Sequence, residues 1–123
     1  MIDLYLDDMR KCPKGFVLAK NAEECVELLR ECEVRVLSLD FDLGWGAPNG
    51  MEVVRFLVAE QKYPAYIYLH SSSAAGRSAM YHMLYTNKPD HVRLFNHPMP
   101  EELLRLIASG KFEVENESAH KLQ

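Results

Sequence analysis

Short apolar runs alternate with helical patterns along most of this chain, and this alternation limits the folds open to it. The runs are rich in β-branched and aromatic residues, which is typical of buried strands. Between them, apolar residues recur at helical spacing, as in the stretch that Asn21 can cap. Such an order predicts βαβ units with helices on both faces of a parallel sheet. We predict strands at residues 2–6, 16–19, 34–39, 65–69 and 92–95, and helices at 22–31, 51–61, 76–85 and 100–108.

The most economical arrangement of these elements is a three-layer α/β sandwich with a mostly parallel, five-stranded sheet. Its strand order is the flavodoxin-like 2-1-3-4-5, which places the first and third strands side by side. The first connection is unusual, because only about ten residues separate the first two strands, fewer than a crossover helix needs. Either the first crossover helix is short or missing, or this edge strand runs antiparallel.

Length and composition fit one compact domain. The chain has 123 residues, of which 48% are hydrophobic and 26% charged, and a chain of this size buries a core without disulfides or structural metals. We place the domain at residues 1–112 and expect residues 113–123 to form a flexible C-terminal tail.

Several classes of partner and compartment are disfavoured. The N-terminus has neither a basic region nor an apolar stretch that could cross a bilayer, so we expect a cytoplasmic protein without a membrane partner. Cys12, Cys25 and Cys32 lack CxxC spacing and are expected to be reduced thiols. The formal charge of -4 argues against a general nucleic-acid coat, which needs a basic face.

Acidic residues follow two of the predicted strands. Asp7 and Asp8 come after the first strand, and Asp40 and Asp42 come after the third. Ligands of open α/β sheets bind beyond the carboxyl ends of the strands, and the predicted order makes these two ends neighbours. Two ionised carboxylates roughly 7 Å apart repel by about 2.4 kcal/mol at an effective dielectric near 20. Something must offset this repulsion.

A raised carboxylate pKa, the neighbouring Arg10 or a hard divalent cation can each offset it. We expect the cation, Mg²⁺ or alternatively Mn²⁺, with Asp7, Asp8 and Asp40 as ligands. Asp42 is then a partner or base, and the choice between Asp40 and Asp42 as the ligand stays open. The alternative is that these aspartates only end strands and begin turns.

The residues after the fourth strand suit an anion. A His-Ser-Ser-Ser run leads through Gly76 and Arg77 into a helix, and hydroxyls, helix N-terminal amides and a guanidinium bind phosphate well. Serines before a helix are also common N-caps, which is the alternative. The predicted phosphate-binding residues are Arg10, Ser71, Ser72, Ser73, Gly76 and Arg77.

Two histidines follow strands four and five. His70 and His97 are candidates for a general acid or base near neutral pH, with a structural role as the alternative for each. No role is expected for the remaining histidines, His82, His91 and His120. The predicted catalytic residues are Asp40, Asp42, His70 and His97.

These features resemble the receiver domains of two-component signalling, with paired acids after strand one, an aspartate after strand three and a hydroxyl after strand four. Receivers usually carry lysine where His97 stands here. The chain is more similar to the receiver-derived family named for cyclic-phosphate processing. The blocks that carry this resemblance are Leu-Asp-Asp-Met-Arg at 6–10, Leu-Asp-Phe-Asp-Leu-Gly at 39–44, and 70–80, which begins His-Ser.

The resemblance implies a receiver-like fold and a cyclic phosphate as ligand, such as a cyclic nucleotide or the 2′,3′-cyclic end of an RNA. Together with the acidic and anion sites, it predicts a metal-dependent phosphoesterase that binds and hydrolyses a small phosphate ester or nucleotide end. The alternatives are a degenerate receiver that binds without turnover and a phosphoacceptor switch. A protein partner or a homodimer is compatible with each of these functions.

Overall fold

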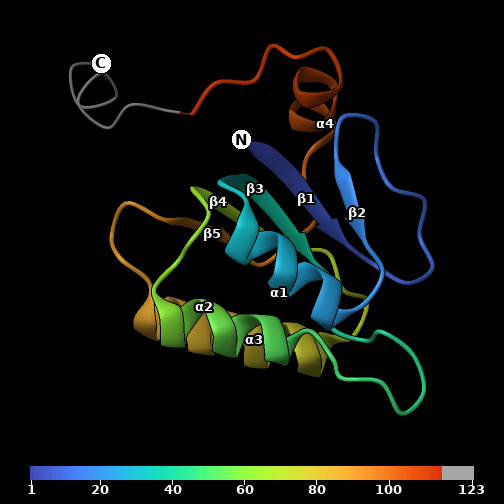
Figure 1. Ribbon diagram of the computed structural model, residues 1–123, viewed down its shortest axis with the longest axis vertical. Coiled ribbons are helices and arrows are strands. Elements are labelled where there is room, and N and C mark those ends of the chain that lie inside the picture. The colour runs from blue at the N-terminus through green and yellow to red at the C-terminus, as the bar shows by residue number, and fades with distance from the viewer. Residues whose placement is uncertain (115–123) are drawn as a thin grey trace.

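Five parallel strands form the centre of the molecule, in the order β2-β1-β3-β4-β5 (Figure 1). The computed structural model describes residues 1–114. Each neighbouring pair of strands is parallel, so the predicted sheet and its order are confirmed. The strands are β1 (Ile2–Leu6), β2 (Val17–Ala19), β3 (Val34–Leu39), β4 (Tyr66–Leu69) and β5 (Arg93–Phe95).

The helices follow their local signals closely. Asn21 caps the first helix by accepting a hydrogen bond from the Glu24 amide. The third helix is longer than predicted, because Ser73 caps it and so moves its start toward the strand. Pro100 is the N-cap of the fourth helix and not its first helical residue. The helices are α1 (Ala22–Glu31), α2 (Met51–Glu60), α3 (Ala74–Asn87) and α4 (Glu101–Ala108).

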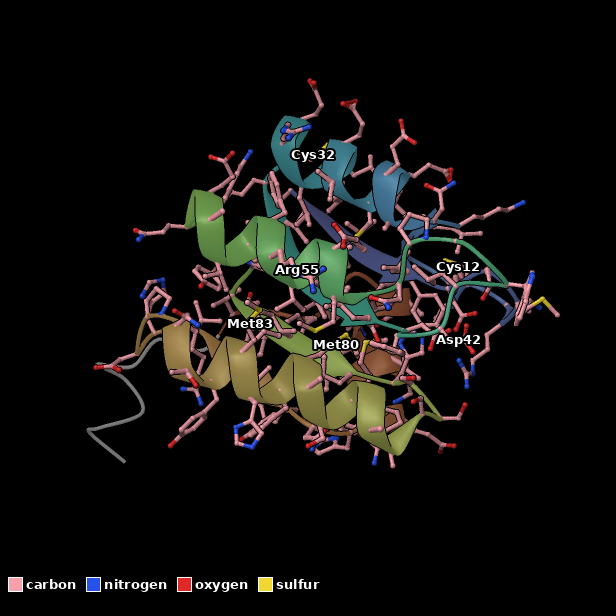
Figure 2. All side chains as sticks on the ribbon, turned by 90° about the horizontal axis from the view of Figure 1, so that it is seen from below. Cys12, Cys32, Asp42, Arg55, Met80 and Met83 are labelled. Carbon is pink, nitrogen blue, oxygen red and sulfur yellow. The ribbon has the colours of Figure 1, made fainter. Side chains whose placement is uncertain are left out.

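The sheet is covered unequally on its two faces. Helices α1, α2 and α3 lie side by side on one face (Figure 2), and α4 covers the other (Figure 1). Because side chains alternate along a strand, each strand contributes to both cores. The three-helix face buries aliphatic residues such as Leu4, Leu37 and Leu69, whereas the α4 face buries tyrosines such as Tyr5 and Tyr68.

The first crossover contains no helix. Between β1 and β2, residues 7–16 form turns and coil, yet β2 runs parallel to β1. The missing helix is therefore confirmed, and the antiparallel alternative is wrong. Phe16 packs edge-on against Tyr5, with 6.2 Å between ring centroids, and Cys12 joins the same cluster. This coil covers part of the face that a crossover helix would otherwise cover.

Three further predictions concern the cysteines, a membrane-spanning helix and the C-terminal tail. Cys12, Cys25 and Cys32 are free thiols, and burial raises the pKa of Cys25 to about 12. Within the described part of the chain, no helix has the length and apolar character needed to span a bilayer. Residues 115–123, which hold most of the predicted tail and His120, lie outside the described residues.

Candidate functional site

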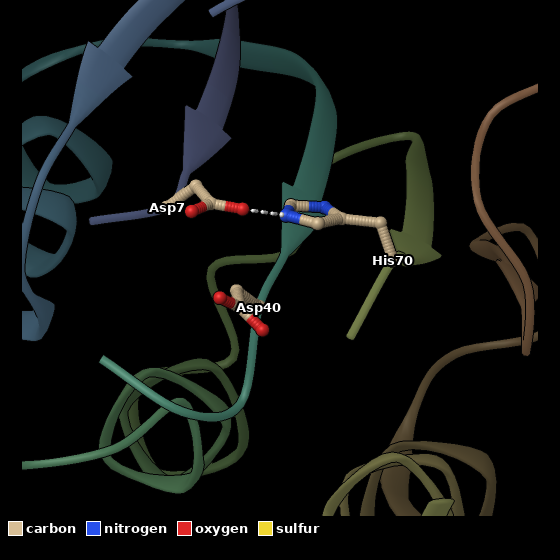
Figure 3. A group of neighbouring side chains, drawn as sticks. All are labelled: Asp7, Asp40 and His70. Carbon is tan, nitrogen blue, oxygen red and sulfur yellow. Dashed lines mark hydrogen bonds and ion pairs between the residues drawn. The ribbon is translucent and has the colours of Figure 1, made fainter. Parts of the chain in front are cut away.

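The register of the sheet brings three polar side chains into one row. The last residues of β1, β3 and β4 pair with one another across the sheet. Asp7, Asp40 and His70 each directly follow one of these residues, so all three lie at the same level of the sheet. The backbone ladder continues through them, since the amides of Asp40 and His70 donate to the ends of the preceding strands. Because Tyr5 and Tyr68 pack on the α4 face, alternation places all three side chains on this face at the carboxyl end of the sheet. Figure 3 shows the three side chains as neighbours, with Asp7 pointing to His70.

Asp7 is buried and uses both of its oxygens. Its Oδ1 accepts hydrogen bonds from the amides of Met9 and Arg10, at 2.8 and 2.9 Å. Its Oδ2 accepts from Arg10 Nη1 at 2.8 Å and faces His70 Nε2 at 2.9 Å. Burial alone raises the pKa of Asp7, but these hydrogen bonds outweigh it and lower the pKa to about 2. Asp7 is therefore ionised at neutral pH.

His70 is held from three sides. Its ring stacks on Tyr5 with centroids 4.5 Å apart and an interplanar angle of 2°, and its Nδ1 lies 2.6 Å from Ser38 Oγ. Burial lowers the pKa of His70 despite the hydrogen bond to Asp7. A neutral ring that donates from Nε2 to Asp7 and accepts at Nδ1 from Ser38 satisfies every group. The His70 ring therefore orients Asp7.

Asp40 shares Arg10 with Asp7. Its Oδ2 lies 3.5 Å from Arg10 Nη1. Burial, and then the charge of Asp7, raise the pKa of Asp40. One guanidinium thus stands between two carboxylates, which leaves one uncompensated negative charge when both are ionised. Two of the three predicted ways to offset the repulsion, the raised pKa and Arg10, are present.

The same row could share a metal ion. Ligand atoms of Asp7, Asp40 and His70 all lie within 4.8 Å of one another. Carboxylate oxygens are the ligands that Mg²⁺ prefers. Both His70 nitrogens already have partners, which suits the ring to orienting a ligating carboxylate from behind. The donor chemistry of the row therefore fits a hard divalent cation on oxygen ligands.

An open cleft of about 650 Å³ lies over Asp7 and Asp40, the two carboxylates of the row. Asp7 and Asp40 are buried there, whereas Asp8 is half-buried and Asp42 is exposed. Asp42 accepts a long hydrogen bond, 3.4 Å, from the Gly44 amide. All four predicted acids thus line one cleft, at different depths. The lining residues are Asp7, Asp8, Met9, Arg10, Asp40, Asp42, Gly44, Trp45, Gly46 and Ser72.

Most of the predicted anion segment is engaged locally. Ser73 Oγ accepts from the Gly76 amide at 3.1 Å and caps α3, and Ser71 Oγ accepts from the Ser73 amide at 3.1 Å. Arg77 Nη1 donates to the Ser71 carbonyl at 2.9 Å. Ser72 is exposed and lines the cleft. Ser72 is therefore the serine of this run that is placed to meet a ligand.

Gly76 serves the packing of α3 against the loop after β3. It is buried, and a Cβ at this position would lie 2.2 Å from Cγ of Phe41. Contacts below 3.0 Å force a shift, here of a whole aromatic ring. The absence of a side chain at Gly76 thus lets α3 begin close to the strand ends.

His97 lies outside the cleft. It is exposed, and its ring contacts Tyr68 and Phe95, with centroids 5.9 and 5.6 Å apart. Its Nδ1 lies 2.8 Å from the Pro98 carbonyl. The neighbouring strand β5 lies three strand spacings from β1, about 14 Å. The sheet therefore does not bring His97 to Asp7. His82 and His91 are exposed and also lie outside the cleft.

Apart from the lining glycines Gly44 and Gly46, four residues of the site were not predicted: Tyr5 and Ser38 behind His70, and Met9 and Trp45 at the cleft. The period of two offered a signal for the first pair, because Tyr5 and Ser38 stand two residues before Asp7 and Asp40. No periodic signal marked the second pair, since both lie in loops.

The comparison with protein families gives one decisive match. The family model of the cyclic-phosphate processing receiver domain matches residues 2–86. The chain belongs to this family. The matched part of this cyclic-phosphate processing receiver domain runs from β1 into α3 and contains Asp7, Asp40 and His70, but not His97. The predicted resemblance is thereby confirmed. No curated protein matches the sequence.

Proposed function

We propose that this domain binds a cyclic phosphate ester in the cleft and hydrolyses it with a divalent cation, Mg²⁺ or Mn²⁺. The observation that carries the proposal is the buried pair Asp7 and Asp40, which share a single arginine at the base of an open cleft. The uncompensated charge favours a cation there. Membership of a family associated with cyclic-phosphate processing supports a phosphate ester as the second ligand.

Asp7, Asp40 and Asp8 would hold the cation through carboxylate oxygens. Bound there, the cation would polarise the phosphoryl group and supply a more acidic water. Arg10 has a side chain 43% exposed, so it has room to turn from the carboxylates toward the phosphate. A guanidinium fork suits phosphate oxygens, which accept its parallel N–H donors.

The roles of the remaining side chains follow from how deeply each one is buried at the cleft. His70 is buried with both nitrogens engaged, so we assign it to positioning Asp7 rather than to proton transfer. Asp42 is exposed on the cleft and is the carboxylate placed to accept a proton from an attacking water. Ser72 is placed to donate its hydroxyl to a phosphate oxygen. His97 has no part in the proposed site.

The test is turnover on a panel of 2′,3′- and 3′,5′-cyclic nucleotides with Mg²⁺ or Mn²⁺, followed by phosphorus NMR. We expect metal-dependent opening of one class of ring, and loss of this activity in Asp40→Asn. The matched control is Asp3→Asn, which changes another buried aspartate far from the cleft. Absence of turnover on every ester would exclude the hydrolase.

A binding domain without turnover is the second candidate. One observation favours it: Arg10 already stands between Asp7 and Asp40, at 2.8 and 3.5 Å, and so supplies one positive charge to the two carboxylates without a metal ion. In that case the cyclic esters bind with the same affinity with and without metal. A phosphoacceptor role of Asp40 is less well supported, because Asp40 is only 5% exposed. Stoichiometric labelling of Asp40 or Asp42 by acetyl phosphate would favour that role.

A further inference from the structure

The rim of the cleft carries two large apolar side chains with almost no protein contact. Trp45 is 104% exposed and Met9 is 86% exposed. Among residues 1–114 these are the two most exposed large apolar side chains, and both line the same cleft. Exposed apolar area of this kind gathered at one place marks a binding surface.

The backbone of Trp45 belongs to a defined turn. The Ala47 amide donates to the Gly44 carbonyl at 3.2 Å, which closes a four-residue turn with Trp45 at its second position. Gly46, at the third position, has φ +74°, which favours glycine in a turn of this type. The base of the turn is tied to Asp42 through the Gly44 amide. The exposed indole therefore lies on the same cleft as Asp7 and Asp40.

The cleft therefore has two chemically distinct parts. Asp7, Asp40 and Arg10 form a charged base, and Trp45 and Met9 form an apolar rim. A ligand that fills both parts needs an anionic or cation-bound group at one end and a flat apolar group at the other. A volume of about 650 Å³ lies within the range of pockets that enclose small organic ligands.

We propose that the substrate carries a nucleobase and that Trp45, which lines the same cleft as Met9, is the specificity-determining residue that stacks on this base. The inference rests on the proposed function, because it takes the cyclic phosphate to bind at the acidic row. Every base has a π face, so stacking on an indole selects base-bearing esters over base-free esters with little preference among bases. The substrate class is a cyclic nucleotide or a nucleoside 2′,3′-cyclic phosphate end.

The experiment compares two esters with the same ring chemistry, 2′,3′-cyclic AMP and glycerol 1,2-cyclic phosphate, in the presence of Mg²⁺. The quantity is the ratio of their affinities, or of their kcat/KM values where they are turned over. We expect Trp45→Ala to lower the affinity for 2′,3′-cyclic AMP about tenfold and to leave the affinity for glycerol 1,2-cyclic phosphate unchanged. Trp45→Phe should keep most of the discrimination.

The chain provides its own optical readout and control. Trp45 is its single tryptophan, so quenching of intrinsic fluorescence by 2′,3′-cyclic AMP reports stacking at this residue. Tyr85→Ala is the matched control, since Tyr85 is an exposed aromatic side chain (64%) away from the cleft. It should leave the ratio unchanged. Because Trp45 is fully exposed, its truncation should not alter folding, which circular dichroism checks.

The outcomes separate this inference from the proposed function. Binding of both esters with an unchanged ratio in Trp45→Ala would overturn the role of Trp45 and leave the phosphate site standing. Binding of neither ester to the wild type would overturn the proposed function and this inference together. A lower ratio of the two affinities in Trp45→Ala, together with quenching of the wild-type Trp45 fluorescence by 2′,3′-cyclic AMP, would support both.

Discussion

Asp3 and Asp7 stand near opposite ends of β1, and each is buried beside an arginine, yet only one of them lines a cleft. Asp3 forms two hydrogen bonds with Arg35 of β3, at 2.9 and 2.5 Å. Arg35 also donates to the Phe112 carbonyl at 2.6 Å and stacks over its ring. One carboxylate meets one guanidinium there, so the pair is electrically balanced and closed.

Asp7 has the opposite setting. It shares Arg10 with Asp40, so two carboxylates meet one guanidinium. The Arg10 side chain is 43% exposed, against 20% for Arg35. The comparison shows what separates a structural ion pair from a candidate site: the first balances its charges in the fold, and the second keeps a surplus that a ligand offsets.

The largest expected difference between the two ends is in activity. Asp40→Asn should lower kcat/KM on a cyclic phosphate by at least about 10³-fold, about 4 kcal/mol, because it removes a carboxylate from the proposed cation site. Asp3→Asn should stay within about threefold under conditions in which it is folded. Steady-state kinetics on purified variants provide the measurement. Similar losses in both variants would abolish the functional distinction between the two ends.

The next largest effect is on stability, and it falls on Asp3→Asn instead of Asp40→Asn. Asp3→Asn removes one partner of a buried ion pair and leaves Arg35 without a counter-charge, which should cost about 3 kcal/mol of unfolding free energy. Urea denaturation followed by circular dichroism measures this cost. A loss below about 1 kcal/mol would show that the Asp3 pair is no more than a surface ion pair in its energetics.

Asp40→Asn should change stability in the opposite direction. Without divalent cations, we expect a gain of about 1 kcal/mol, because the substitution removes a buried charge that burial and Asp7 both destabilise. The same urea experiment, run with a chelator, tests this gain. Destabilisation by Asp40→Asn would mean that Arg10 already balances the two carboxylates fully.

The smallest effect is a pH dependence caused by His70. Burial lowers the pKa of His70 from 6.5, so between the folded and unfolded values the unfolded chain binds more protons. The stability due to His70 is therefore present above pH 6.5 and declines as the pH falls below it. The raised pKa of Asp40 makes the fold more stable as the pH falls, which opposes the effect of His70. The effect of His70 is therefore measured in the Asp40→Asn variant.

The test follows the urea midpoint of Asp40→Asn from pH 7.5 to 5.0. We expect a decline that is absent in the double variant Asp40→Asn/His70→Asn. The pKa of Asp7, about 2, keeps its titration below this range. Equal slopes in the two proteins would show that His70 does not resist protonation in the fold.

Most of the fold could be predicted because local and long-range signals agree. The strand runs, the Asn21 cap and the βαβ order all lead to one topology, which the structure confirms. The direction of β2 could not be predicted, since the connection before it contains no helix and β2 is nevertheless parallel to β1. Coil segments that replace a helix have no periodic pattern to read.

The candidate site was predictable in its acids and less so in its polar surroundings. The neighbouring strand ends predicted that the four aspartates share one cleft. The sequence did not indicate how deeply each one is buried: Asp40 is buried, whereas Asp42 is exposed. His70 follows from register, as does the position of Asp7. His97 does not line the cleft, because β5 is separated from β1 by both β3 and β4. The serine hydroxyls could not be assigned in advance, because a cap and a ligand contact use the same atoms.

Cation binding tests the central claim most directly. Isothermal titration calorimetry with Mn²⁺ on the wild type, Asp40→Asn and Asp3→Asn compares the two ends of β1 in one experiment. We predict one saturable site per chain in the wild type and in Asp3→Asn, and loss of this site in Asp40→Asn. Equal binding by Asp40→Asn, or no saturable binding by the wild type, would contradict the assignment of the Asp7 and Asp40 row as a cation site.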